Sequence, residues 1–281
     1  MSATLIGLGL GPAHFPTHER DAARNPAATS DRNRAFPLSC ISPLGTEESA
    51  LRLGVHALDA ALQGGLAVGA LHELAPASEL QLGAAFGFAL TLATLAAAKD
   101  GRQVLCITTE FAAREGGVPY GVGLDLFGLP LERLLILRVA HPREALWGFE
   151  EGLKCRALAA VLAELPQEGE AADFTATRRL ALAAQAGGGL GLLLRHHRYP
   201  LPSAAMTRWQ VAAAASAPDR FGGLGGTRFD LTLERNRRGR CGRFIAEWNH
   251  DERTFVPQEL SLGMAEATRD RSDRAYRRRT A

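Results

Sequence analysis

Two runs of strand length, residues 103–110 and 158–165, are apolar almost throughout, and they constrain most strongly how this chain can fold. A strand of this kind must be covered on both faces, as in a parallel sheet. A third strand is expected at residues 190–197, and segments with helical periodicity separate the three. Because strands that alternate with helices imply right-handed crossovers, the sequence predicts an α/β fold, with helices on both faces of a mostly parallel central sheet.

The chain of 281 residues divides into one folded domain and two flanking segments. Residues 1–48 are rich in Pro, Asn, Ser, Asp and Arg without a sustained period, which predicts a flexible leader. Residues 49–257 contain the periodic segments, and a hydrophobic content of 46% suits a single domain with a full core. Residues 258–281 are expected to form a basic flexible tail.

The last third of the domain changes its pattern. Residues 203–217 are predicted to form a helix. Apolar and polar residues then alternate in residues 229–233 and again in residues 244–248, so each run presents one apolar face. The string NRRGRCG lies between the two runs and contains glycine. This arrangement predicts a C-terminal antiparallel β-hairpin with a basic tip.

Residues 73–90, ELAPASELQLGAAFGFAL, lie between a predicted strand and a long predicted helix, where a phosphate-binding loop would be expected. Such a loop uses glycines to point N–H groups inward, a lysine to reach the phosphates, and a Ser or Thr hydroxyl to hold magnesium. This segment has no lysine and no glycine before Gly83. Phe86 and Gly87 stand where the lysine and the hydroxyl residue would be, and neither can replace them.

Ser78 and Glu79 already occupy the amino terminus of the long helix. The string SELQ matches a capping box, in which the Ser78 hydroxyl caps the first turn and Gln81 reaches back. The helix end carries a partial positive charge, but Glu79 would repel a triphosphate. The residues therefore favour a plain strand–loop–helix over a nucleotide site of unusual type, and we expect no cofactor.

Two glutamates, Glu110 and Glu164, end neighbouring buried strands, where ligands collect in open α/β sheets. In an active enzyme one would polarise a water molecule and the other would hold magnesium. Carboxylates in this position also serve as helix caps or salt-bridge partners. Since nothing in the sequence brings a γ-phosphate to them, we expect no catalysis and no enzyme.

Metal sites and other catalytic arrangements find little support. His196 and His197 are adjacent on a strand, so they should point to opposite faces and cannot share one metal. The four cysteines lie far apart and form no CxxC pair, so the sequence does not indicate a zinc site. Trp147 is interpreted as a packed aromatic on a helix whose other face is acidic.

Arginines gather in two places although the net charge of the chain is only +2. In either place the arginines could contact DNA phosphates and make binding sensitive to salt. They could instead only make the turn or the tail more soluble. The tail could also fold on a protein partner. The candidates at the hairpin tip are Arg235, Arg237, Arg238, Arg240 and Arg243. Those in the tail are Arg277, Arg278 and Arg279.

The longest uncharged run, residues 82–98, reaches only the lower limit for crossing a bilayer and consists mostly of Ala, Gly and Thr. A buried core helix explains it better than a membrane span. The amino-terminal residues have neither a basic region nor a clear cleavage site, so they make a poor signal peptide. We therefore expect a cytoplasmic protein without a membrane partner.

Several strings resemble known families. GVHALDAALQGGLAVGALHEL is similar to the segment that leads into the Walker loop of RecA recombinases. EALWGFEEGLKCRALAAVLAEL, TRRLALAAQAGGGLGLLLR and FDLTLERNRRGRCGRFIAEW, in this order and spacing, resemble the ImuA family. The resemblance runs from about residue 51 to residue 248, and it leaves the leader and the arginine tail outside.

The resemblance implies a RecA-like fold and a role in the SOS response to DNA damage. ImuA-like proteins are accessory factors in translesion synthesis and induced mutagenesis. The expected partners are an ImuB-like Y-family polymerase homologue, RecA itself, and an error-prone polymerase of the replicative type. In this resemblance Glu110 falls at the catalytic carboxylate of RecA, Glu164 falls at the Walker B carboxylate, and Phe86 replaces the Walker lysine.

Two other functions remain open from the sequence. One is an ATP-dependent, DNA-binding ATPase of the RecA kind, which would need a lysine from elsewhere, such as a neighbouring subunit. The other is an SOS-induced inhibitor of cell division that would act on FtsZ. The replacement of the lysine by Phe86 favours a non-catalytic scaffold over the ATPase.

Overall fold

A computed structural model describes residues 4–7, 50–165, 173–197, 202–216, 218, 222–223 and 225–256. Most of the predicted leader and the whole predicted tail, with Arg277, Arg278 and Arg279, lie outside these residues.

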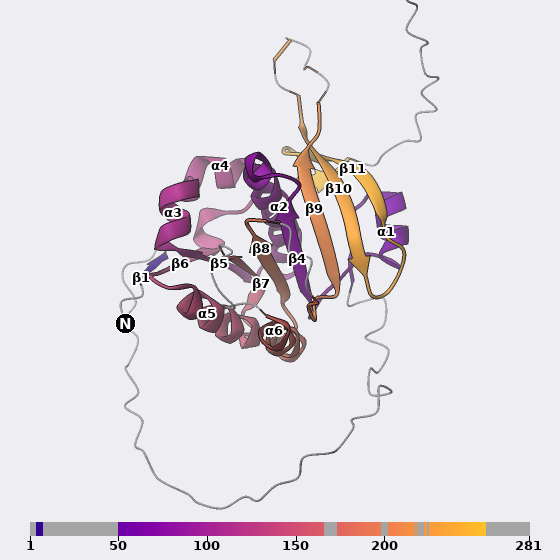
Figure 1. Cartoon of the computed structure of the whole chain (residues 1–281). Helices are drawn as coiled ribbons and strands as arrows, with labels where there is room; N and C mark the ends of the chain where they lie inside the picture. Colours follow the sequence, from indigo (N-terminus) through magenta and orange to yellow (C-terminus); the bar gives the residue numbers. More distant parts are fainter. Residues whose placement is uncertain are drawn as a thin grey trace, which may run out of the picture.

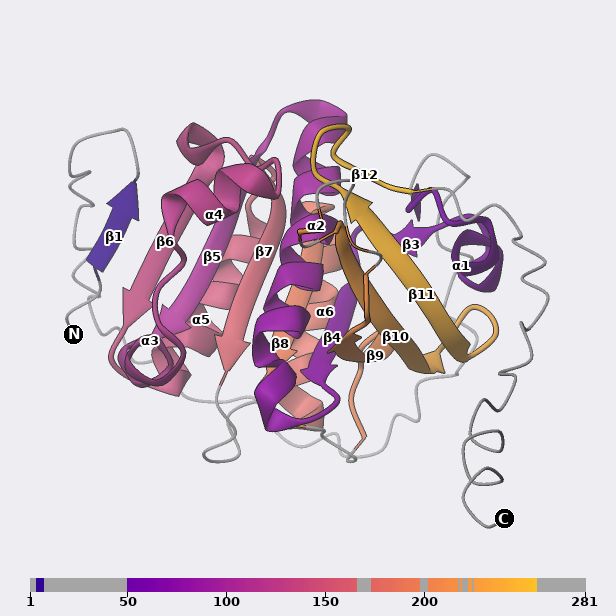
Figure 2. The same cartoon turned by 90° about the horizontal axis from the view of Figure 1, so that it is seen from above.

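The described part of the chain forms one large mixed sheet, which confirms the predicted fold class. In spatial order its strands are β1 (Thr4–Gly7), β6 (Leu134–Val139), β5 (Gln103–Thr109), β7 (Leu158–Leu165), β8 (Leu190–Arg195), β4 (Leu71–Pro76), β9 (Thr207–Ala213), β10 (Thr227–Asn236), β11 (Gly242–Asn249) and β12 (Thr254–Phe255). The strands from β6 to β9 are parallel, and antiparallel pairs extend the sheet at both ends (Figure 2). A separate two-stranded sheet pairs β2 (Ala50–Leu51) with β3 (Leu66–Ala67).

Helices cover both faces of the parallel strands, as expected (Figure 1). One face carries the 3-10 turn η3 (Glu79–Gln81) and the helices α2 (Leu82–Asp100), α3 (Glu110–Gly116) and α4 (Gly121–Leu126). The opposite face carries α5 (Pro142–Lys154) and α6 (Phe174–Gly187). The short helix α1 (His56–Ala61) lies beside β11, and the turn η4 (Leu131–Arg133) leads into β6.

The long helix α2 is the centre of the larger hydrophobic core. Its side chains are apolar around most of the helix, and it packs on β7, β4, β8 and β9. Phe88 is fully buried and contacts the rings of Trp209, Phe229 and Phe255 at centroid distances of 5.6–6.1 Å. Within the described residues, η3 and α2 together form one helix long and apolar enough to cross a membrane, but most of it is buried in the protein. The prediction of a core helix agrees with this packing.

The helix that the sequence predicts at residues 203–217 does not form in the described residues 203–216. The structure instead places strand β9 there, between β4 and β10. Thr207, Trp209 and Val211 point into the core, and the residues between them are partly exposed, so the burial has a period of two. Alanines around this short run mask the alternation, and the pairing of β9 with both neighbours overrides their helical preference.

Two further expectations need correction. β1 lies within the predicted flexible leader and pairs antiparallel with β6, from Thr4 opposite Arg138 to Gly7 opposite Leu135. Trp147 on α5 is 66% exposed and is not packed as predicted. The predicted β-hairpin is confirmed: β10 and β11 pair in register, with Phe229 opposite Ala246.

A buried histidine on β4 ties three elements together. His72 is fully buried, and its Nε2 lies 2.8 Å from the Ala67 carbonyl oxygen. Because a carbonyl only accepts, Nε2 donates, and the neutral Nδ1 accepts from the Thr207 hydroxyl at 2.7 Å. Trp209 Nε1 donates to the same hydroxyl at 2.7 Å. In this arrangement both nitrogens of the neutral His72 ring have a hydrogen-bond partner.

We expect this histidine to make the fold sensitive to acid. Burial lowers the pKa of His72 to about 4, against the smaller opposing effect of the hydrogen bond to Ala67. Since an unfolded histidine titrates near pH 6.5, its stabilising effect is complete above that pH and is lost as pH falls toward 4. The free energy of unfolding should drop by about 2 kcal/mol between pH 7.5 and pH 5 from this group alone. An NMR titration in which His72 protonates with an ordinary pKa would contradict this prediction.

Candidate functional site

The connection between β4 and α2 is too short to wrap a phosphate group. β4 ends at Pro76 and η3 begins at Glu79, so only Ala77 and Ser78 lie between them. Pro76 has no amide N–H, and the N–H of Ala77 donates to the Val211 carbonyl on β9 at 2.8 Å. The connection therefore lacks the succession of inward-pointing N–H groups that a phosphate cradle uses.

The predicted capping box does not form. The Ser78 side chain makes no capping hydrogen bond, and the first turn is the 3-10 turn η3. The Gln81 side-chain oxygen instead accepts from the Ala213 N–H on β9 at 2.8 Å. Glu79 stays at the helix start as predicted, with its side chain 82% exposed and 3.6 Å from His197. This helix end is therefore fastened to the sheet and carries a negative charge.

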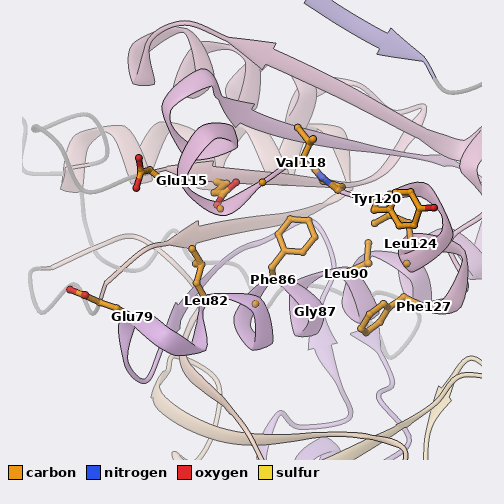
Figure 3. Close-up of a pocket in the computed structure, with 16 residues that line it drawn as sticks. Glu79, Leu82, Phe86, Gly87, Leu90, Glu115, Val118, Tyr120, Leu124 and Phe127 are labelled. Carbon is orange, nitrogen blue, oxygen red and sulfur yellow. The ribbon is translucent and has the colours of Figure 1, made fainter. Parts of the chain in front are cut away.

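Phe86 and Gly87 lie well inside α2, beyond its first turn. Phe86 is partly buried and packs against the core (Figure 3). A Cβ atom added to Gly87 would lie 3.4 Å from the Phe127 ring and 3.6 Å from the Phe229 ring, so aromatic side chains fill the space beside it. Both residues line the open groove described below, but neither carries the amine or the hydroxyl that a phosphate or a magnesium ion would need.

The two strand-end glutamates have different environments. β5 and β7 are neighbours, as predicted. Glu110, however, begins α3 with a half-exposed side chain, 3.7 Å from Arg114 one turn along the helix. Glu164 is largely buried and accepts a hydrogen bond from the Thr108 hydroxyl at 3.1 Å. The first is thus a helix-surface ion pair and the second is a buried acceptor.

The histidines after β8 also separate. His196 Nε2 lies 2.9 Å from the Glu164 carboxylate, while His197 approaches Glu79. The two rings therefore contact different carboxylates. Burial, and after it the charge of Glu164, raises the pKa of the Cys106 thiol to about 12. Among the described residues, no three His, Cys, Asp or Glu side chains come together in a way that would hold a metal ion.

An open groove of about 510 Å³ lies between α2 and the segment that joins α3 to α4. Its floor is one face of α2, formed by Leu82, Phe86 and Leu90 (Figure 3). One wall is residues 116–120, and the side chains of α4 and the following turn close the far end. Glycine-rich backbone in this wall leaves the floor accessible.

The groove has an acidic end and an apolar end. Glu79 and Glu115 stand at the acidic end, and Leu124 and Phe127 stand at the apolar end (Figure 3). Glu164 also lines the groove, with its carboxylate near Gly116. The described lining residues include no lysine and no arginine. Glu79, Phe86 and Glu164 were each recognisable in the sequence, but nothing in their spacing indicated that the α3–α4 segment would complete a groove around them.

A buried ion cluster on β4 was not foreseen from the sequence. Glu73 is 2% exposed and accepts hydrogen bonds from Arg195 at 2.7 Å and from Arg208 at 2.9 Å. The Ser203 hydroxyl donates to the same carboxylate at 2.8 Å. Burial by itself would raise the pKa of Glu73, but the two arginines and the serine outweigh it and hold the pKa below its usual value. The cluster joins β4, β8 and β9.

The hairpin arginines do not form one surface. Arg235 Nη1 and Arg237 Nη2 both donate to the Ser203 carbonyl, at 2.7 Å and 3.1 Å. Burial and then the nearby charge of Arg235 lower the pKa of Arg237. These two side chains therefore fasten the hairpin to the loop before β9.

The other three hairpin arginines are arranged differently. Arg243 forms an ion pair with Asp230 across the two strands, with Nε 2.7 Å from Oδ1. Arg238 and Arg240 show no side-chain hydrogen bond or ion pair within the described residues. Of the five candidate arginines at the hairpin tip, these two have side-chain charges that remain available to a partner.

Comparison with known proteins decides the family. Over 200 residues the chain is 35% identical to Protein ImuA of Caulobacter vibrioides, in both strain NA1000 / CB15N and strain ATCC 19089 / CIP 103742 / CB 15. The match covers 66% of this chain and 77% of each relative. The chain belongs to the ImuA family. No protein-family profile matches the sequence.

The fold comparison agrees with this assignment. The structure is similar to the crystal structure of the RadB recombinase, with a TM-score of 0.52 and 17% sequence identity. The match covers 74% of this chain and all of the RadB chain. This ImuA-family chain therefore has a RecA-like fold, as the resemblance implied. Family and fold together support an accessory role in mutagenesis.

Proposed function

We propose that this protein is a non-catalytic accessory factor in DNA-damage-induced translesion synthesis, acting in the cytoplasm through contacts with other proteins. The short connection between β4 and α2 supports this proposal. The Ala77 N–H in this connection already donates a hydrogen bond to the Val211 carbonyl, and the helix that follows begins with the negatively charged Glu79. Binding energy for a triphosphate normally comes from this place in the fold. Without it, the fold supplies a rigid platform for partners.

The proposed partners follow from the family. They are an ImuB-like Y-family polymerase homologue, RecA, and an error-prone polymerase of the replicative type. The half-buried Arg238 and the exposed Arg240 would add weak DNA contacts whose strength falls as salt rises.

Co-purification with the ImuB-like protein and with RecA tests the proposal. We expect the intact chain to retain the ImuB-like protein. Repeating the experiment without residues 258–281 separates contacts of the arginine tail from contacts of the folded domain. Capture of FtsZ without the ImuB-like protein would support a cell-division inhibitor instead and would overturn the proposal.

Nucleotide should not stabilise this protein. A ligand present at a hundred times its dissociation constant adds about 2.7 kcal/mol to the free energy of unfolding. In a protein of this size that corresponds to a rise in melting temperature of about 5–10 °C. We expect a change of less than about 1 °C with millimolar Mg-ATP in a thermal melt, with RecA as the positive control. Steady phosphate release that Glu110→Gln abolishes would contradict the proposal.

A further inference from the structure

The groove between α2 and the α3–α4 segment combines an apolar floor with a negative end. Leu82, Phe86 and Leu90 are spaced four residues apart on α2, so they form one continuous stripe. Glu79 and Glu115 stand at one end of this stripe (Figure 3). The third glutamate, Glu164, is held in place by Thr108 and His196, so the negative charge there has a fixed position.

The segments that border the groove also expose large apolar side chains. Leu80 on η3 is 95% exposed, and Tyr120, at the mouth of the groove, is 74% exposed. Val118 on the α3–α4 segment and Val122 on α4 are each more than half exposed. An exposed apolar surface of this kind, rimmed by charge, is typical of a site that binds another protein.

The charges define the chemistry of the occupant. Phosphate groups would meet three carboxylates and no lysine or arginine among the described lining residues, so a nucleotide or a nucleic acid backbone is unsuited to the groove. A cationic group at the acidic end and a large apolar side chain on the α2 stripe would each meet a complementary surface. A volume of about 510 Å³ is that of a site for a short peptide segment or a small molecule.

We propose that this groove binds a segment of a partner protein in which lysine or arginine stands beside large apolar side chains. The inference deepens the proposed accessory function and rests on it, because it identifies the surface and the kind of segment through which a protein contact is made. The apolar side chains of the segment lie on Leu82, Phe86 and Leu90. Its basic residues lie against Glu79 and Glu115.

A phage-displayed library of random 12-residue peptides, selected on the purified full chain, tests the proposal. We expect the enriched peptides to share a basic residue close to Leu, Phe, Tyr or Trp. Their affinity, measured by fluorescence anisotropy, should fall as salt rises from 50 to 250 mM, because the charges are near the surface. Enrichment of acidic sequences, or of no common sequence, would overturn the proposal.

Variants of exposed residues locate the binding surface without threatening the fold. Tyr120→Ala, and separately Glu79→Lys combined with Glu115→Lys, should each weaken an enriched peptide at least tenfold. Matched controls on the opposite face, Trp147→Ala and Glu151→Lys, should change the affinity less than twofold. Equal effects of the groove variants and the controls would place the peptide elsewhere and overturn the proposal.

Two other occupants give distinct results. If the chain's own residues 257–281 filled the groove, deleting them would raise peptide affinity more than tenfold. If a second copy filled it, the protein would self-associate and Tyr120→Ala would abolish this. Either result would overturn the assignment to a partner protein. None of these measurements involves the ImuB-like protein, RecA or ATP, so a failure here is distinguishable from a failure of the proposed function.

Discussion

Replacing Glu73 by alanine should destabilise the folded protein by about 3–5 kcal/mol, the range found when one member of a buried ion pair is removed. The carboxylate is 2% exposed and faces Arg195 and Arg208, whose side chains are also largely buried. Without it, the like charges of two neighbouring cations remain in a poorly solvated place. Urea denaturation at neutral pH measures the change.

The Asp230–Arg243 pair provides the matched control. It also joins a carboxylate to an arginine, but the Arg243 side chain is 71% exposed. Asp230→Ala should therefore cost less than about 1 kcal/mol. If Glu73→Ala were no more destabilising than Asp230→Ala, the buried cluster would not be what holds β4, β8 and β9 together.

Phe88→Ala should be comparably damaging, at about 3–5 kcal/mol, because it empties the space between α2 and the antiparallel strands. The ring contacts Trp209, Phe229 and Phe255, and all four residues are buried. Trp209 and Phe229 come from β9 and β10, which are each paired with a strand on both sides, so these two rings cannot collapse into the cavity easily. Denaturant unfolding followed by tryptophan fluorescence reports the loss directly, since Trp209 lies beside the cavity.

Trp147→Ala is the corresponding change on the surface. It removes a larger aromatic side chain from α5, but that side chain is 66% exposed. We expect the free energy of unfolding to change by no more than about 0.5 kcal/mol. A large loss from Trp147→Ala would mean that this side chain packs as the sequence suggested.

The parallel half of the sheet was predictable from the sequence because its strands carry their own signal. Residues 158–165 are buried at every position, and residues 103–109 at all but the first, so uninterrupted apolar runs mark both strands. The hairpin signal was equally direct, since turn residues separate two runs of period two. Strand β9 gave no such signal. Its identity depends on pairing with β10 and with β4, and β4 lies far from it in sequence.

The site was predictable only in what it lacks. The absence of a lysine near Phe86 can be seen in the sequence, but the bond from Ala77 to Val211 cannot, because it joins residues more than a hundred positions apart. The same holds for Glu73, which appears as an ordinary strand residue until Arg195 and Arg208 are placed beside it. The groove likewise needs the fold to bring Tyr120 over α2.

The pairing of β1 with β6 has a practical consequence for how this protein is handled. β6 has β5 on one side, and on the other side the described structure offers only the four residues Thr4–Gly7. A shortened chain that starts at the folded domain would leave a row of N–H and C=O groups of Leu134–Val139 open to any extended strand. Precipitation of such a fragment would then result from the unpaired edge strand β6, and it would not show whether the core had folded.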